Sequence, residues 1–388
     1  MMEYAISGMT LIGVAFFHHR ALLVALTGLS AVMFLQVVSA PSLDSAAHEL
    51  LEHFVHEWVI LANLFLLLLG FAVLSNQFEQ SGLPEAIPSW LPVGWVGGVT
   101  LLGLVFLLSI FLDNIAGAII GGVAARHVFP RGVTVGFLAA ITAAANAGGA
   151  GSVIGDTTTT MMWISGISPL EVLPAFIGAL VAFTVFAPFA AIAQQKTSPM
   201  VQANLGGVVI DWMRVGIVGF ILSVLVSVNV VANNSFPQHE EFAPVLGLGL
   251  WIAILLSAPL RSPEWSSARH SLNGSLFLVV LVALASLMPL ESLPNPSTVT
   301  IFGLGVLSAV FDNIPLTALA INQGGYDWGL LAYAVGFGGS MVWFGSSAGV
   351  ALTNLFPTGR SLFAWLREGW FIPLSFIVGF VAMVATSA

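Results

Sequence analysis

The stretch "FLDNIAGAII" (residues 111–120) places an aspartate and an asparagine in the middle of a run of apolar side chains. The same pattern returns in "VFDNIPLTAL" (residues 310–319). A charged side chain at the centre of a bilayer costs on the order of 3 kcal/mol or more, so an acid kept there generally marks an ion or proton path. Both stretches therefore indicate a protein whose function lies at interruptions in its apolar segments.

The composition is that of a protein that crosses a membrane many times. Hydrophobic residues make up 58% of the chain and charged residues only 7%, whereas a soluble domain carries about 25% charged residues. A span needs roughly 20 mostly apolar residues, and the apolar runs leave room for about ten full spans. We expect residues 4–17 to be the first span and not a removable signal peptide, because no charged segment precedes them. The absence of cysteine excludes disulfides and thiolate metal sites.

All the basic residues fall on one side of the membrane if two of the apolar segments enter the membrane and return on the same side. Those segments, 94–129 and 297–322, are interrupted at Asp113 and Asp312, and we interpret them as re-entrant helical hairpins. All nine basic residues then fall on one face: Arg20, Arg126, Arg131, Lys196, Arg214, Arg261, Arg269, Arg360 and Arg367. Basic residues in short loops remain cytoplasmic. We therefore expect a multi-pass protein of the cell inner (cytoplasmic) membrane.

The chain contains a weak internal repeat. "LDNIAGA" (112–118) matches "FDNIPLT" (311–317) at an offset of 199, and "GGAGSVIGDTTTTMM" (148–162) matches "GGSMVWFGSSAGVAL" (338–352) at an offset of 190. In each half the pattern predicts a hairpin followed by a broken transmembrane helix. The two halves then have opposite orientations in the membrane. Inverted repeats with broken helices at the midplane are a transporter architecture. The predicted parts are N-terminal scaffold spans (1–92), a first transport repeat (93–195), a linker with scaffold spans (196–294) and a second transport repeat (295–388).

The two predicted breaks supply oxygen ligands of the kind that a hard cation takes. Backbone that leaves a helix inside a bilayer must find partners, since each unpaired polar group costs several kcal/mol. Freed carbonyls and the hydroxyls of Thr157–Thr160, Ser346 and Ser347 would bind such a cation. We expect the helices to unwind at Gly148, Gly149, Gly155, Gly338, Gly339 and Gly345.

Of the eighteen acidic residues, Asp113, Asp156 and Asp312 lie deep in the membrane by this topology, and all three lie in the interruptions. No lysine or arginine falls at that depth, so each carboxylate is either protonated or paired with a mobile cation. A carboxyl group withdrawn from water favours its neutral form, so release of its proton can be coupled to binding of sodium. The alternative is that these aspartates only cap half-helices and that the threonines only pack helices together.

These motifs resemble those of the NhaD-type sodium/proton antiporters, which stand beside citrate, dicarboxylate and arsenite carriers in the ion transporter superfamily. "LDNIAGA", "GDTTTTMMWI", "FDNIPLTA" and "GGSMVWFGSSAGV" carry the resemblance, which covers roughly residues 55–195 and 295–360. It implies a homodimer in which hairpins and broken helices move as an elevator. Together, the family pattern and the breaks predict an ion and proton site at Asp113, Asn114, Asp156, Thr157, Thr158, Asp312, Asn313, Thr317, Ser340 and Ser346, with sodium at Asp113, Asn114, Asp156, Asp312 and Asn313.

The chain departs from the family pattern at two places. Ala116, Gly117 and Ala118 follow the first DN pair, where family members usually carry hydroxyls. Family members also tend to carry an acid in the stretch that here reads "LLLLGFAVLSN" (66–76), which contains no acid before Glu79. Without that carboxylate, three alternatives stay open: the protein exchanges ions in a different ratio, it is a symporter, or it carries another substrate.

We therefore predict a secondary active transporter that exchanges Na⁺ or Li⁺ for H⁺, with no cofactor and no enzymatic activity. The alternative is a Na⁺- or H⁺-coupled carrier of citrate, a dicarboxylate or an oxyanion, which a deep arginine would favour; Arg126 is the nearest. An intramembrane aspartyl protease would use a G-x-G-D motif, which Val-Ile-Gly-Asp at 153–156 does not match. The predicted partners are these ions or small anions, the lipid bilayer and a second copy of the chain, and no motif indicates nucleic acid.

"HELLEHFVHEW" (48–58) contains histidines and glutamates at helical i,i+4 spacing. The metalloprotease motif H-E-x-x-H is absent from it. We interpret it as an amphipathic segment on the outer surface ahead of a span, and the alternative is a pH-sensing cluster, since histidine titrates near neutrality.

Overall fold

The computed structural model of the chain describes residues 6–10, 13–14, 20–201, 209–235, 243–287, 294–311 and 313–387, and the regular structure of these residues is helical. They form eighteen α-helices and one 3₁₀ helix, η4 (Pro357–Arg360). The chain divides into two compact units, described separately below. Unit 1 comprises 1–77, 216–294 and 317–324, and unit 2 comprises 78–215, 295–316 and 325–388. The all-α prediction is confirmed, and the four-part division made from the sequence stays a prediction.

Among the described residues, four helical segments are long and apolar enough to cross a membrane. They are α2 (Ala21–Ser39), α3 (Leu43–Glu79), Pro169–Thr197, which contains α9 (Pro169–Val172) and α10 (Ala175–Thr197), and α13 (Ser266–Ser286). A fifth is the pair α18 (Leu362–Glu368) and α19 (Phe371–Ser387), bent by 59° at a short break. Further apolar helices have 10–17 residues, and the total of about ten spans stays a prediction. The expected span 4–17 lies largely outside the described residues.

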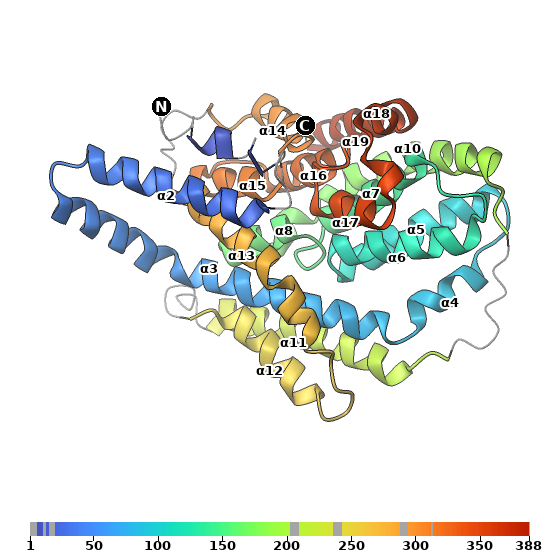
Figure 1. The fold of residues 1–388 in the computed structure, drawn as a ribbon, viewed down its shortest axis with the longest axis horizontal. Coiled ribbons are helices and arrows are strands. Elements are labelled where there is room, and N and C mark those ends of the chain that lie inside the picture. Colours follow the sequence, from blue (N-terminus) through green and yellow to red (C-terminus); the bar gives the residue numbers. More distant parts are fainter. Residues whose placement is uncertain are drawn as a thin grey trace. The chain divides into compact units, whose positions relative to one another are not determined.

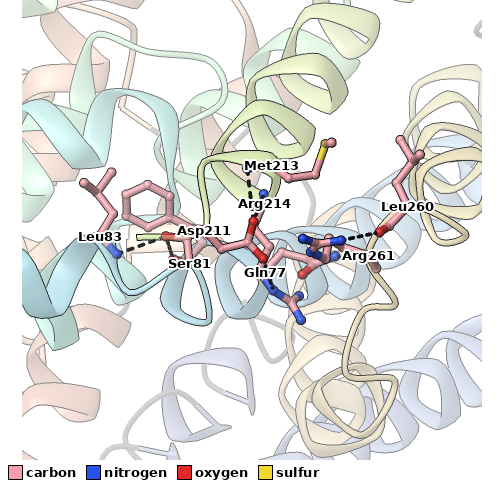
Figure 2. Close-up of polar contacts among 9 residues, drawn as sticks. Gln77, Ser81, Leu83, Asp211, Met213, Arg214, Leu260 and Arg261 are labelled. Atoms are coloured by element: carbon pink, nitrogen blue, oxygen red, sulfur yellow. Dashed lines mark hydrogen bonds and ion pairs between the residues drawn. The ribbon is translucent and has the colours of Figure 1, made fainter. Parts of the chain in front are cut away.

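Polar side chains in unit 1 bind backbone groups of neighbouring helices. In the contact between α3 and α12 (Val245–Ser257), Asn63 Oδ1 accepts from the amide of Gly247 (3.0 Å), and Trp251 Nε1 donates to the carbonyl of Leu66 (2.9 Å). In the same unit, Gln77 Nε2 donates to the carbonyl of Arg261 (2.9 Å), as Figure 2 shows. Such pairing is what polar groups need where water is excluded.

The histidine-rich segment 48–58 belongs to α3, one continuous helix of 37 residues that joins it to the apolar stretch after it; its place on the outer surface stays a prediction. No glycine or proline interrupts residues 43–69, so nothing in the sequence stops the helix. His48 Nε2 lies 3.2 Å from Glu52 Oε1 on an exposed face. His53 Nε2 lies 2.9 Å from the hydroxyl of Ser286, which is also in unit 1.

In unit 2, α5 (Trp95–Phe111) and α6 (Asn114–Val128) lie side by side (Figure 1) and are joined at residues 112–113. A Cβ on Gly117 would overlap the hydroxyl of Ser109, and a Cβ on Gly121 would overlap the side chain of Val105. Because residue numbers rise along one helix as they fall along the other, the two helices are antiparallel. The chain therefore turns back at Asp113, as the sequence predicts.

The corresponding helices of the second half are α14 (Thr298–Ser308) and α15 (Asn313–Gln323). The division between the units falls inside α15, at Thr317. Asp312, the predicted tip of the second hairpin, lies outside the described residues, so that hairpin stays a prediction.

Two helices are interrupted close to the predicted breaks but slightly later in the chain, since Gly148, Gly149 and Gly338, where we expect unwinding, are still helical. Residues 151–156 separate α7 (Val135–Ala150) from α8 (Thr157–Ile164), and residues 339–346 separate α16 (Trp328–Gly338) from α17 (Ser347–Leu355). Glycine lets two backbones touch just before each break. A Cβ on Gly148 would overlap the carbonyl oxygen of Phe106, and a Cβ on Gly338 would overlap that of Gly305.

A second pair of equivalent contacts lies at the far end of each break. A Cβ on Gly155 would overlap the carbonyl oxygen of Ser109, and a Cβ on Gly345 would lie 2.9 Å from that of Ser308. The glycines in both pairs are related by the offset of 190, and the carbonyls that they meet by the offset of 199. The two halves of unit 2 therefore repeat backbone contacts as well as sequence motifs.

The described residues 209–211, in the predicted linker region 196–294, lead into a capped helix. The amide of Asp211 donates to the carbonyl of Ser81 (2.8 Å), just before α4 (Leu83–Trp90). The carboxylate of Asp211 accepts from the amide of Met213 (3.1 Å) and lies 3.7 Å from Arg214 Nε at the start of α11 (Trp212–Ser235) (Figure 2). A carboxylate in this place stabilises the helix through its free amides and its dipole.

We expect Gly148→Ala and Gly338→Ala each to lower the free energy of unfolding by about 1–3 kcal/mol, because the added methyl group must push two backbones apart. Gly303→Ala in α14 is the control, since nothing lies within 4 Å of the place its Cβ would take. Thermal unfolding of the purified protein in detergent measures the effect. Equal midpoints for all three variants and the parent would contradict the close approach.

Candidate functional site

Asn146 joins polar side chains from two other segments of unit 2. It lies in α7 and is completely buried. Its Oδ1 accepts a hydrogen bond from Asn114 Nδ2 (3.1 Å), and its Nδ2 donates to the hydroxyls of Ser340 (2.9 Å) and Ser346 (3.0 Å). One amide thus binds the hairpin turn of the first half to the break of the second half.

The first DN pair lies against the first break. The amide of Asn114 donates to the carbonyl of Gly155 (3.0 Å). Asp113 caps α6 by accepting from the amide of Ile115 (3.0 Å). The hairpin turn therefore meets the residue that immediately precedes Asp156.

Asp156 ends the first break and begins α8. Its side chain is only 2% exposed, and its Oδ1 accepts from the amide of Thr158 (3.3 Å). Its Oδ2 faces α16, because a Cβ on Gly336 would lie 3.4 Å from that oxygen. Asp113 and Asp156 are therefore both helix caps, which is compatible with ion binding, since each capping bond uses a single oxygen of the carboxylate.

The hydroxyl run after Asp156 divides into two roles. Thr159 Oγ1 donates to the carbonyl of Ser152 (2.6 Å) and Thr160 Oγ1 to that of Val153 (2.9 Å), which fastens the break to α8. Thr158 is completely buried, and its hydroxyl has no hydrogen-bond partner among the described residues. Thr157 is partly exposed. Thr158 is therefore the hydroxyl of this run that is best placed to take a ligand.

The predicted site residues of the second half do not all lie together. Ser340 and Ser346 are buried in the Asn146 network, and Ser346 also caps α17 by accepting from the amide of Gly349 (3.3 Å). Asn313 is buried at the start of α15. Thr317 is buried too, but it belongs to unit 1. Asp312 lies outside the described residues.

Among the buried polar residues of unit 2 that the sequence motifs do not identify, three lie in helices next to the first hairpin turn and the first break. Asn146 is one, and its signal was available as the single polar residue in "AAANAGGA" (143–150). The others are Ser109 and Thr142, whose hydroxyls are buried without a hydrogen-bond partner in the described part of the chain. Single hydroxyls in apolar helices are common packing groups, so the sequence alone gave no reason to select these two.

Arg126, the basic residue nearest to the predicted site in the sequence, has a structural role at a helix end. Its Nη2 donates to the carbonyl of Leu355, the last residue of α17 (2.9 Å). Its guanidinium lies over the ring of Phe356 at 4.9 Å from the centroid. A cation at a helix C-terminus stabilises the terminal carbonyls.

Sequence comparison finds similarity to sodium/proton antiporters. The chain is 31% identical to sodium/proton antiporter 1 of Arabidopsis thaliana, over 67% of this chain and 50% of that protein. It is 28% identical to the Na⁺/H⁺ antiporter NhaD of Vibrio parahaemolyticus, over 84% of this chain and 89% of that protein. It is 25% identical to the NhaD antiporter of Alkalimonas amylolytica, over 86% of this chain and 78% of that protein. It thus spans half the length of the Arabidopsis relative, and no family model matches it.

We expect Asn146→Ala to lower the free energy of unfolding by about 1–3 kcal/mol, because Asn114, Ser340 and Ser346 lose a buried partner together. Once the serines have also been changed to alanine, replacing Asn146 should cost less, since fewer polar groups are left unpaired. Unfolding midpoints of the single, double and triple variants in detergent give the coupling. Strictly additive losses would show that the amide and the two hydroxyls do not act as a network.

Proposed function

Because the chain is a distant member of the family of NhaD-type and plant sodium/proton antiporters, we propose that it exchanges Na⁺ or Li⁺ for H⁺ across the cell inner membrane. Its helices and these relatives make it a multi-pass membrane protein. The relatives named here are transporters and not enzymes. The ions, their stoichiometry and the particular membrane are part of the proposal.

The observation that carries the proposal is the buried carboxylate of Asp156 at an unwound helix junction. It is 2% exposed, it begins α8, and its neighbour Gly155 is bonded to the first DN pair. Burying a bare carboxylate is costly, and the cost falls when the group binds a proton or a cation. A site with these two loaded states is what an exchanger requires.

We assign the ion and proton site to the predicted residues that lie at the two hairpin turns and the two breaks. The oxygen atoms that we propose as cation ligands in the first half are those of the Asp156 carboxylate, the Asn114 side chain and the hydroxyl of Thr158, which has no hydrogen-bond partner among the described residues. These are hard oxygen ligands of the kind that sodium takes. The proposed set in unit 2 is Asp113, Asn114, Asp156, Thr157, Thr158, Asn313, Ser340 and Ser346, while Asp312 and Thr317 stay predictions from the sequence.

Coupling follows from competition for one carboxylate. Sodium binds when Asp156 has released its proton, and a returning proton displaces sodium. The unloaded, charged form is the least stable form of a buried carboxylate, so the site changes sides while it carries one ion or the other. The two ion flows are then linked without any covalent chemistry.

We also propose the architecture that moves the site. Two inverted repeats, each with a re-entrant hairpin and a broken helix, would form a domain that moves as an elevator in a homodimer. The equivalent backbone contacts of Gly148 and Gly338 support the repeat. The alternative carrier of citrate, a dicarboxylate or an oxyanion is less well supported, because Arg126 is engaged at the end of α17.

We expect Asp156→Asn to abolish sodium-driven proton movement in proteoliposomes, because the amide cannot exchange a proton for sodium. Glu171→Gln is the control: Glu171 is an exposed carboxylate in the capping box of α9, and glutamine can keep that box. A pH-sensitive dye trapped in the vesicles reports the exchange. Exchange retained by Asp156→Asn would refute the assignment, and citrate uptake with no cation-driven proton movement in the parent would favour the alternative carrier.

We expect Thr158→Val to raise the sodium concentration needed for half-maximal exchange by about tenfold, which corresponds to about 1.4 kcal/mol of lost binding. Valine keeps the shape and removes a hydroxyl that has no partner in the described residues. Thr160→Val removes a hydroxyl that is bonded to the backbone, so it should lower the unfolding midpoint and change the sodium dependence little. Equal sodium dependence for Thr158→Val and the parent would exclude the hydroxyl as a ligand.

A further inference from the structure

A cavity of about 420 Å³ lies in unit 1 and is lined by residues from the ends of α2 and α13 and from the first third of α3. Its polar lining comes from all three helices and comprises Gln36, Ser39, Glu49, His53 and Ser286. Leu287, which also lines it, forms a buried apolar cluster with Val32 and Leu284. An apolar core thus supports the polar lining, and the cavity shares no residue with the ion and proton site proposed above.

The hydrogen bonds of Ser286 decide which nitrogen of His53 carries a proton. The hydroxyl of Ser286 donates to the carbonyl of Ala283 (3.0 Å), and the same oxygen lies 2.9 Å from His53 Nε2. A hydroxyl has only one proton to donate, so both contacts are satisfied when His53 Nε2 carries a proton and donates it to Ser286. In a neutral imidazole Nδ1 then holds a free lone pair, and this atom has no hydrogen-bond partner among the described residues.

Two further side chains of the cavity also offer acceptors. Gln36 Nε2 donates to the carbonyl of Leu287 (3.3 Å), which leaves the amide oxygen of Gln36 as an acceptor. The carboxylate of Glu49 forms no hydrogen bond or ion pair with the described residues. The hydrogen bonds of unit 1 therefore engage the nitrogen donors of His53 and Gln36. A nitrogen lone pair, an amide oxygen and a carboxylate remain for a ligand.

The sequence around the cavity favours a positively charged ligand. No lysine or arginine lies between Arg20 and Arg126, whereas residues 41–58 alone contain four carboxylates, those of Asp44, Glu49, Glu52 and Glu57. Charges of one sign raise the local concentration of counter-ions. Glu49 and His53 are four residues apart on α3, so their side chains are neighbours on one face of the helix and can reach one ion.

We propose that this cavity binds a divalent transition-metal ion such as Zn²⁺ through His53 Nδ1, the carboxylate of Glu49 and the amide oxygen of Gln36. An imidazole suits zinc, copper or nickel, whereas magnesium and calcium prefer oxygen ligands alone. The contact of His53 Nε2 with Ser286 is the outer hydrogen bond that metal-binding histidines generally make. Among the described residues no group of three His, Cys, Asp or Glu could hold a metal ion, so Gln36 and water complete the coordination. The ion links α2 to α3, and the proposal does not depend on the exchange function.

Isothermal titration calorimetry with zinc chloride and the purified full chain in detergent tests the proposal. We expect the parent to bind one zinc ion per chain at this site. Glu49→Gln keeps the shape of the side chain and removes its charge, and His53→Ala removes the nitrogen ligand. Each should lower the zinc affinity by about tenfold or more. Glu49 is exposed, so Glu49→Gln decides the matter if His53→Ala does not fold.

His48→Ala is the matched control, because His48 and Glu52 are the same two residue types at the same spacing on the same helix. Their side chains already pair at 3.2 Å on an exposed face, and neither lines the cavity. We expect His48→Ala to bind zinc like the parent. An equal loss of affinity in His48→Ala and His53→Ala would show that zinc binds the histidines of α3 without a defined site. That result, or a parent that binds no zinc, would overturn the proposal.

Ser286→Ala tests the role of Ser286 as a positioning residue, because it leaves all three proposed ligands in place. Without the hydroxyl, the proton of His53 is free to move to Nδ1, so the zinc affinity should fall about tenfold. Ser286→Thr keeps the hydroxyl and should bind zinc like the parent. Unchanged zinc affinity in Ser286→Ala would overturn the assignment of His53 Nδ1 as the ligand atom.

Discussion

The structure depends on the need to satisfy backbone polar groups where helices unwind inside an apolar protein. At the first break the chain meets this need by letting backbones touch: Gly155 packs on the carbonyl of Ser109, and its own carbonyl accepts from the amide of Asn114. Only glycine permits so close an approach, because a Cβ on Gly155 would overlap that oxygen. The same contacts hold the hairpin turn against the break, and they fix Asp156 at the start of α8.

The polar groups around this junction divide into a neutral part and a charged part. The neutral part is the Asn146 network, in which an amide and two hydroxyls satisfy one another and bind the two halves of unit 2 together. The charged part is the carboxylate of Asp156, with the hydroxyl of Thr158 nearby in the sequence. A satisfied network makes a site rigid, whereas a buried carboxylate gives it two loaded states. In the proposed exchanger the Asn146 network keeps the site rigid and the carboxylate of Asp156 binds the ion.

Much of this arrangement was predictable because its signals are local. Acids in apolar runs gave the turn at Asp113, and glycine clusters gave both breaks. The network was not predictable, because the role of Asn146 depends on partners almost two hundred residues away. The division of the threonine run also depends on the path of the loop, since the hydroxyl of Thr160 reaches the carbonyl of Val153 whereas that of Thr158 has no partner among the described residues. The helix α3 continues through the polar pattern around His48, because no glycine or proline lies between residues 43 and 69.

The most direct test of the central claim is the release of protons when sodium binds to the purified protein in weakly buffered detergent solution, followed with a pH-sensitive dye. If one buried carboxylate holds either a proton or sodium, the two bindings are thermodynamically linked. We expect sodium to release about one proton for each ion bound while the carboxyl group is still protonated. Sodium that binds without displacing any proton at any pH would contradict it.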